Sequence, residues 1–122
     1  MRQTGLGFKS LYKATGTNNV AVGYEAGAEI LAGSSNVCIG YQAGDAITSG
    51  SNNIVFGNGA TASAATVSNE MTLGNSSITK LRVPGIGLSF TSAGAVISGV
   101  ATATSFSGSG AVISGVATAT SF

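Results

Sequence analysis

The chain has 122 residues, of which 19 are glycine, and it contains neither histidine nor tryptophan. Only nine side chains carry charge, five basic and four acidic, and the net charge is +1. The weak charge gives nucleic acid no electrostatic footprint, and the short, interrupted apolar runs predict no membrane insertion. Without histidine and with a single cysteine, the chain lacks the usual catalytic triads and zinc sites, so we expect no enzyme activity, no cofactor and no metal.

Charge is also absent from residues 83–122. A surface so poor in charge does little to keep copies of a protein apart. The composition therefore predicts an obligate homo-oligomer.

Residues 1–15 are predicted to be a degenerate repeat that caps the N-terminal end. Gly7-Phe8 matches Gly23-Tyr24 and Gly40-Tyr41 of the regular copies that follow. Terminal repeats are often atypical because they close a stack of repeats.

Residues 16–83 are predicted to form an all-β block of stacked coils. Segments that begin at Gly16, Gly33 and Gly50 repeat one motif at equal spacing. Such a short, constant period is typical of solenoids, in which each repeat buries its apolar face against the next. Residues 20–22, 37–39 and 54–56 are predicted strands, and because both of their faces are apolar we expect one face in the coil and one against a neighbour.

Turn residues flank each predicted strand. Asparagine precedes it and glycine follows it, so we assign a structural turn role to Asn19, Gly23, Asn36, Gly40, Asn53 and Gly57. Asparagine can bond its own backbone and adopt a left-handed conformation, and glycine adopts positive φ without steric cost.

Three weaker signals complete the block. Ile30 and Ile47, which are separated by one full period, suggest a second strand in each coil. Met71 and Leu73 alternate in an altered last coil. Cys38 aligns with Ala21 and Val55 of the other copies, which predicts a small, buried and inert side chain.

Residues 84–122 are predicted to form a thin β-repeat shaft. The segment 94–106 recurs without change at 110–122, so a second repeat family with its own period begins here. One strand parity is bulky and the other is small, which suits three chains that approach closely at an axis.

The sequence resembles two families of fibrous proteins. The segments 19–27 and 36–44 resemble head repeats of trimeric autotransporter adhesins and of phage tail fibres, and 73–85 is similar to the exit from such heads. The segment 99–110 looks like repeats of marine cyanobacterial phage tail fibres. The resemblance implies a homotrimer of left-handed parallel β-coils, although the period exceeds that common in the adhesins and no heptad neck follows.

These observations favour a structural segment of a bacteriophage tail fibre, located in the virion, that extends or presents a tip for host attachment. The implied partners are two further copies of the chain, other fibre or tail proteins and a bacterial surface glycan. The alternative is the head of a bacterial trimeric surface adhesin, which would be extracellular. An ice-binding solenoid is disfavoured because Thr17 aligns with Ser34 and Ser51 rather than with threonine.

Tyr24 and Tyr41 are the candidate receptor contacts. Both follow a turn glycine, where stacked coils would bring aromatic rings to the rim. Aromatic faces could pack on sugar rings, or the two rings could join neighbouring coils or subunits. Of the four carboxylates, Glu25 and Glu29 are candidates for a catalytic pair only by default, and we expect them to be solvated loop acids.

Overall fold

The computed structural model describes residues 2–85, 88–91 and 94–97. The described residues divide into two units, with the boundary between Thr79 and Lys80. The described residues contain strands and turns but no helix, so the prediction of an all-β chain is confirmed. The first unit ends at Thr79, four residues before the end of the coil block that the sequence predicts. Residues 80–83 belong to the second unit because they pair with the strand that follows them.

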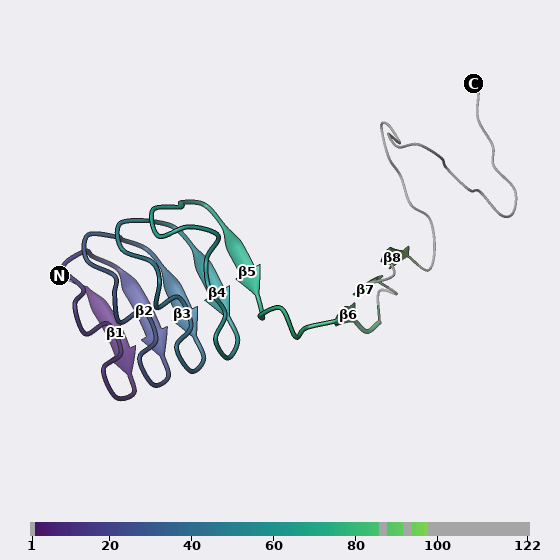
Figure 1. Cartoon of the computed structure of the whole chain (residues 1–122), viewed down its shortest axis with the longest axis horizontal. Coiled ribbons are helices and arrows are strands. Elements are labelled where there is room, and N and C mark those ends of the chain that lie inside the picture. Colours follow the sequence, from purple (N-terminus) through teal and green to yellow (C-terminus); the bar gives the residue numbers. More distant parts are fainter. Residues whose placement is uncertain (1, 86–87, 92–93, 98–122) are drawn as a thin grey trace, which may run out of the picture. The chain divides into compact units, whose positions relative to one another are not determined.

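The first unit is a parallel β-solenoid (Figure 1). Its strands lie side by side in sequence order, and each coil contributes one strand to the sheet. The five strands are β1 (Gln3–Leu6), β2 (Asn19–Val22), β3 (Val37–Ile39), β4 (Ile54–Phe56) and β5 (Met71–Leu73).

The register follows the sequence period. Val20 lies opposite Val37, which lies opposite Ile54, which lies opposite Met71. Gln3 lies opposite Asn19, so the first coil is one residue shorter than the others. Equivalent residues therefore form straight columns along the solenoid.

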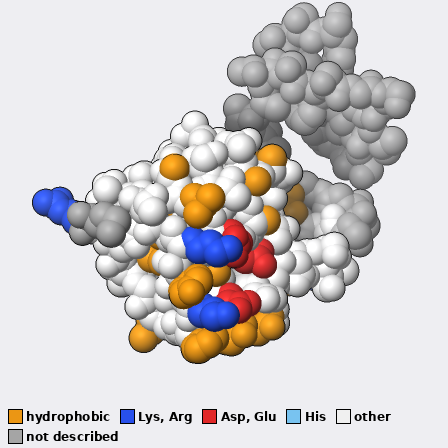
Figure 2. Space-filling view, turned by 60° about the vertical axis from the view of Figure 1, so that its left-hand side comes forward, with side chains coloured by type: hydrophobic (Ala, Val, Ile, Leu, Met, Phe, Trp, Pro, Cys, Tyr) orange, Lys and Arg blue, Asp and Glu red, His pale blue; other side chains and the backbone are white. Residues whose placement is uncertain are grey.

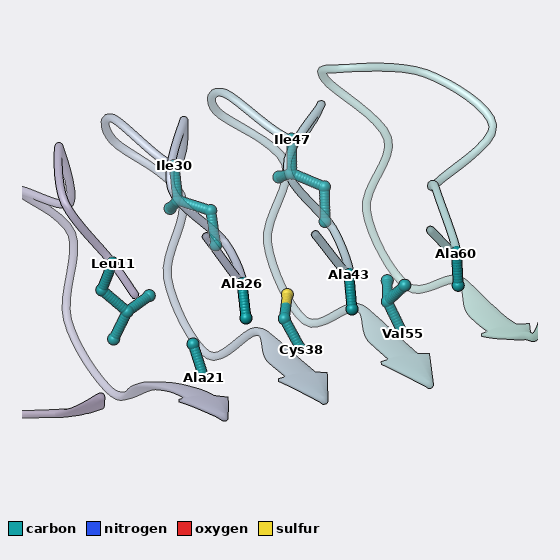
Figure 3. Packing of buried hydrophobic residues seen from close by; sticks show 9 residues of the cluster. All are labelled: Leu11, Ala21, Ala26, Ile30, Cys38, Ala43, Ile47, Val55 and Ala60. Atoms are coloured by element: carbon teal, nitrogen blue, oxygen red, sulfur yellow. The ribbon is translucent and has the colours of Figure 1, made fainter. Parts of the chain in front are cut away.

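The core is a narrow row of small and branched apolar side chains between the coils (Figure 3). Ala21, Cys38 and Val55 point inward from the strand centres and are fully buried. Ile30 and Ile47 meet them from the returning loops and are also fully buried. The buried position predicted for Cys38 is confirmed.

The second strand expected near Ile30 and Ile47 is wrong. Turns cover residues 24–29 and 41–46, and the residues that follow are not in a strand. Neighbouring coils still join here, since the backbone N–H of Leu31 donates to Thr48 O at 2.8 Å. One inward isoleucine per loop can fill the core without the alternation that a strand requires.

The glycines after the strands allow adjacent coils to approach closely. Gly23 and Gly40 each have φ of +133°, in a region that side chains resist. A Cβ placed on Gly40 would lie 2.5 Å from the carbonyl oxygen of Gly57 in the next coil.

The outer face of the sheet is apolar. One column runs through Val20, Val37, Ile54 and Met71, and a second consists of Leu6, Val22, Ile39, Phe56 and Leu73. Val20, Val37 and Ile54 are half-buried. Met71, in the same column, is 62% exposed, and Phe56 of the second column is 40% exposed. We call these two columns the outer apolar face.

The second unit contains a three-stranded antiparallel sheet in sequence order. Its strands are β6 (Lys80–Val83), β7 (Leu88–Thr91) and β8 (Gly94–Ile97). Pro84 and Gly85 form a turn after β6. The predicted shaft repeats lie almost wholly in 98–122, outside the described residues.

Candidate functional site

A buried ladder of asparagine side chains runs through the solenoid. Asn19, Asn36 and Asn53 are each fully buried at the start of β2, just before β3 and just before β4. The side-chain amide of Asn36 donates to Gly50 O at 2.9 Å, and its Oδ1 accepts the backbone N–H of Asn53 at 3.0 Å. Asn19 and Asn53 make the same contacts one coil earlier and one coil later.

The two ends of the ladder carry different residues. Gln3 occupies the equivalent place in the first coil and donates to Gly16 O at 2.7 Å. Glu70 occupies it in the last coil, where its carboxylate turns outward to the backbone and hydroxyl of Ser63. Hydrogen bonds from Ser63 lower the pKa of Glu70, so it stays ionised near neutral pH.

The sequence predicts that these asparagines bond their own backbone in a left-handed turn, and the structure shows a different arrangement. Their side chains bond the neighbouring coil, and positive φ falls on the preceding residues Asn18, Ser35 and Asn52. A buried amide must be fully hydrogen-bonded, and only the stacked coils supply the partners. This column holds the coils together, and its polar atoms are used within the fold.

Aromatic rings form a second column, at the rim. The ring centroids of Phe8 and Tyr24 are 5.5 Å apart, and those of Tyr24 and Tyr41 are 5.3 Å apart with an interplanar angle of 10°. The rings are partly exposed, with Tyr24 at 41% and Tyr41 at 50%. The fold thus brings together the two tyrosines that the sequence singled out.

Stacking covers one ring face each of Phe8 and Tyr41 and leaves the central ring the least exposed of the three. Tyr24 lies between Phe8 and Tyr41, so both of its faces are covered by other rings. Lys9 Nζ lies 5.4 Å from the centroid of Phe8. The neighbouring Glu25 carboxylate is the main cause of the raised pKa of Tyr24, which therefore stays protonated at neutral pH.

Beside the aromatic column, charged side chains surround a pocket of about 220 Å³. Figure 2 shows basic and acidic side chains gathered side by side on one face, with apolar side chains next to them. The pocket is lined by Lys9, Tyr12, Lys13, Glu25, Ala28, Glu29 and Asp45. Five of the nine charged residues of the chain therefore meet at one place.

Column geometry explains the pocket. The backbone N–H of Lys13 bonds Ala28 O and that of Leu11 bonds Ala26 O, which makes Tyr12, Ala28 and Asp45 equivalent in successive coils. Alanine leaves a gap between a phenol ring and a carboxylate. We call this gap the Ala28 notch.

Ion pairs flank the notch on both sides. Lys13 Nζ lies 2.6 Å from Glu29 Oε2, and Lys9 Nζ lies 4.0 Å from Glu25 Oε1. Gln42 also donates to Glu25 at 2.9 Å. Partial burial raises the pKa of Asp45, with smaller contributions from the charges of Glu25 and Glu29.

Glu25 and Glu29 are each held by a lysine of the first coil. Among the described residues, no group of three or more cysteine, aspartate or glutamate side chains could hold a metal ion. In the same part of the chain, no helix has the length and apolar character to cross a membrane. The buried Cys38 thiol has its pKa raised to about 11 by desolvation, so it is a poor nucleophile.

No protein-family model, curated protein sequence or solved structure matches this chain.

Sequence reasoning missed the Ala28 notch. It depends on the shorter first coil, which aligns Tyr12 and Lys13 with Ala28 and Glu29. The spacing from Gly7 to Gly23, which is shorter by one position than the spacing from Gly23 to Gly40, could have revealed that alignment.

Proposed function

We propose that this chain is a structural segment of a bacteriophage tail fibre, built as a homotrimer of left-handed parallel β-coils that lead into a thin shaft. Its role is mechanical: it holds an attachment tip away from the particle. The class of protein is inferred from the resemblance of the sequence motifs. Self-association is inferred from the outer apolar face.

The outer apolar face supports self-association for two reasons. It contains no charged side chain, and its residues repeat at the spacing of the coils, about 4.8 Å. A partner that covers the whole face must present apolar groups at the same spacing. A second copy aligned in parallel does so, coil against coil.

The solenoid core gives a further reason. Among the described residues, four of the eight fully buried apolar side chains are alanine, and two coils contribute one isoleucine each. Larger apolar side chains such as Phe56 and Met71 are more exposed than this core. Covering them would supply burial that the thin coil lacks, at about 25 cal/mol per Å² of apolar surface.

The mass of the protein in dilute solution tests the assembly. We expect a trimer, and we expect Ile39→Lys to dissociate it because a charge would enter the uncharged face. Ser49→Lys, in a loop outside the strands, should leave the mass unchanged. A folded, dilute monomer of the unsubstituted chain would rule out the proposal.

A role in the particle is tested by host adsorption. If the segment binds a receptor through the aromatic column, particles that carry Tyr24→Ala and Tyr41→Ala should adsorb less while their trimers stay intact. Unchanged adsorption would assign the column to joining coils. A parent gene that encodes a membrane-anchor barrel and a coiled-coil neck would instead select the bacterial adhesin.

A further inference from the structure

The Ala28 notch has a shape set by three successive coils. Ala28 forms its floor, Tyr12 forms one end and Asp45 forms the other. Because neighbouring coils are about 4.8 Å apart, the coils that carry the ring and the carboxylate are about 10 Å apart, and the pocket between these side chains has a volume of about 220 Å³. That space suits a small molecule of about the size of one sugar residue.

The charges in the notch are not balanced. Each lysine has a glutamate partner, at 4.0 Å for Lys9 and 2.6 Å for Lys13. Among the described residues, Asp45 forms no ion pair within 4.0 Å. The three carboxylates and two ammonium groups of the notch thus leave one negative charge, and it belongs to Asp45.

The opposite end is suited to a flat ring. Tyr12 is 67% exposed, whereas Tyr24 has both faces covered by other rings. Lys9 Nζ lies 5.7 Å from the centroid of the Tyr12 ring, so the ring area that is not covered by this ammonium group is what a pyranose can pack against through its C–H face. The ion-paired Lys13 and Glu29 lie beside it to exchange hydrogen bonds with hydroxyl groups.

We propose that the Ala28 notch binds an amino sugar, with the pyranose ring against Tyr12 and the ammonium group on the Asp45 carboxylate. A bound ammonium group neutralises the uncompensated charge, and a charge-assisted hydrogen bond gives it orientation. The pKa of Asp45 is raised chiefly by partial burial and to a smaller extent by Glu25 and Glu29, and a bound ammonium group would favour its ionised form. The site is separate from the outer apolar face and does not depend on the role in a fibre.

The test is an NMR titration of the full chain at neutral pH with glucosamine, and with glucose as its uncharged counterpart. Glucosamine should shift the amide signals of Ala28 and Asp45 and bind at least ten-fold more tightly than glucose. Added salt should weaken the binding, because an ion pair at a partly exposed site is screened.

Three variants locate the site. Asp45→Asn should weaken glucosamine binding at least ten-fold by removing the charge, and Ala28→Leu should abolish it by filling the notch without changing any charge. Glu70→Gln removes a carboxylate that lies outside the notch and should bind glucosamine normally. Thermal melting of each variant establishes that the fold is intact.

Equal affinity for glucose and glucosamine, or no binding of either, would overturn the proposal. Unchanged glucosamine binding by a folded Asp45→Asn protein would overturn it as well. None of these results bears on the trimer, which is measured separately by mass.

Discussion

Gly40 combines two constraints that a side chain would violate at once. Its φ is +133°, and a Cβ there would lie 2.5 Å from the carbonyl oxygen of Gly57. We therefore expect Gly40→Val to cost more than about 2 kcal/mol of unfolding free energy, or to prevent folding. Urea denaturation followed by circular dichroism measures the change.

Gly59 provides a matched control. It also has positive φ, at 58°, but a Cβ there would meet only the Asn75 side chain, at 4.0 Å. Asparagine tolerates this conformation, so Gly59→Asn should change stability by less than about 1 kcal/mol. If both variants melt like the unsubstituted chain, close approach of the coils is not what requires glycine at position 40.

The reactivity of the Cys38 thiol reports whether the core is closed to solvent. Its pKa is raised to about 11, so the reactive thiolate is scarce at pH 8. We expect iodoacetamide to label the folded protein at least 100-fold more slowly than the protein in urea. Because the folded pKa lies above the usual value near 9, the stabilising effect of the protonated thiol is complete below pH 9 and is lost as the pH rises toward 11. Rapid labelling of the native protein would contradict the buried position.

Columns of equivalent side chains join successive coils, and the asparagine ladder is the most buried of these columns. Asn36→Ala would leave Gly50 O and the backbone N–H of Asn53 without their partners. Each unsatisfied buried group costs about 1–3 kcal/mol, so we expect the two together to cost about 2–6 kcal/mol in chemical denaturation. Asn58→Ala, at an exposed position, should change the unfolding free energy by less than about 0.5 kcal/mol. Equal effects of the two substitutions would exclude the ladder as a source of stability.

The sequence predicted the strands of the coils but not all of their contacts. The alternation around Ala21, Cys38 and Val55 identified three strands because inward and outward positions differ in size. Ile30 and Ile47 do not lie in strands. A single apolar residue in each loop gives no alternating pattern from which its conformation could be predicted. For the asparagines, no local sequence pattern distinguishes an amide that bonds its own turn from one that bonds the next coil.

The sequence likewise predicts only some of the contacts in the candidate site. Stacking of Tyr24 on Tyr41 follows from the constant period of the motif, and the structure confirms it. The Ala28 notch depends on the register of the first coil, where one missing residue changes which side chains meet. A repeat with a constant period is predictable, whereas its exceptions need coordinates.

At the scale of the whole solenoid, one coil should be removable as a unit. Deletion of residues 33–49 joins Ala32 to Gly50 and brings Val20 beside Ile54, while Asn19 meets Asn53 in place of Asn36. Repeat proteins gain stability from each neighbouring pair, so we expect a shorter solenoid that unfolds in one transition at a lower temperature. Calorimetry measures the transition.

Deletion of residues 33–45 is the control, because it changes the period and destroys the register of every column. That protein should not fold. If both deletions unfold the chain, the coils are not interchangeable units.

The asparagine ladder also gives the solenoid a direction. The side-chain oxygens of Asn19, Asn36 and Asn53 all accept the backbone N–H of the coil that follows in the sequence. On the ribosome, each coil that has closed would therefore present a vacant acceptor to the residues that emerge next. Synthesis and stacking then proceed in the same sense, and a chain released one coil at a time can be ordered as it grows.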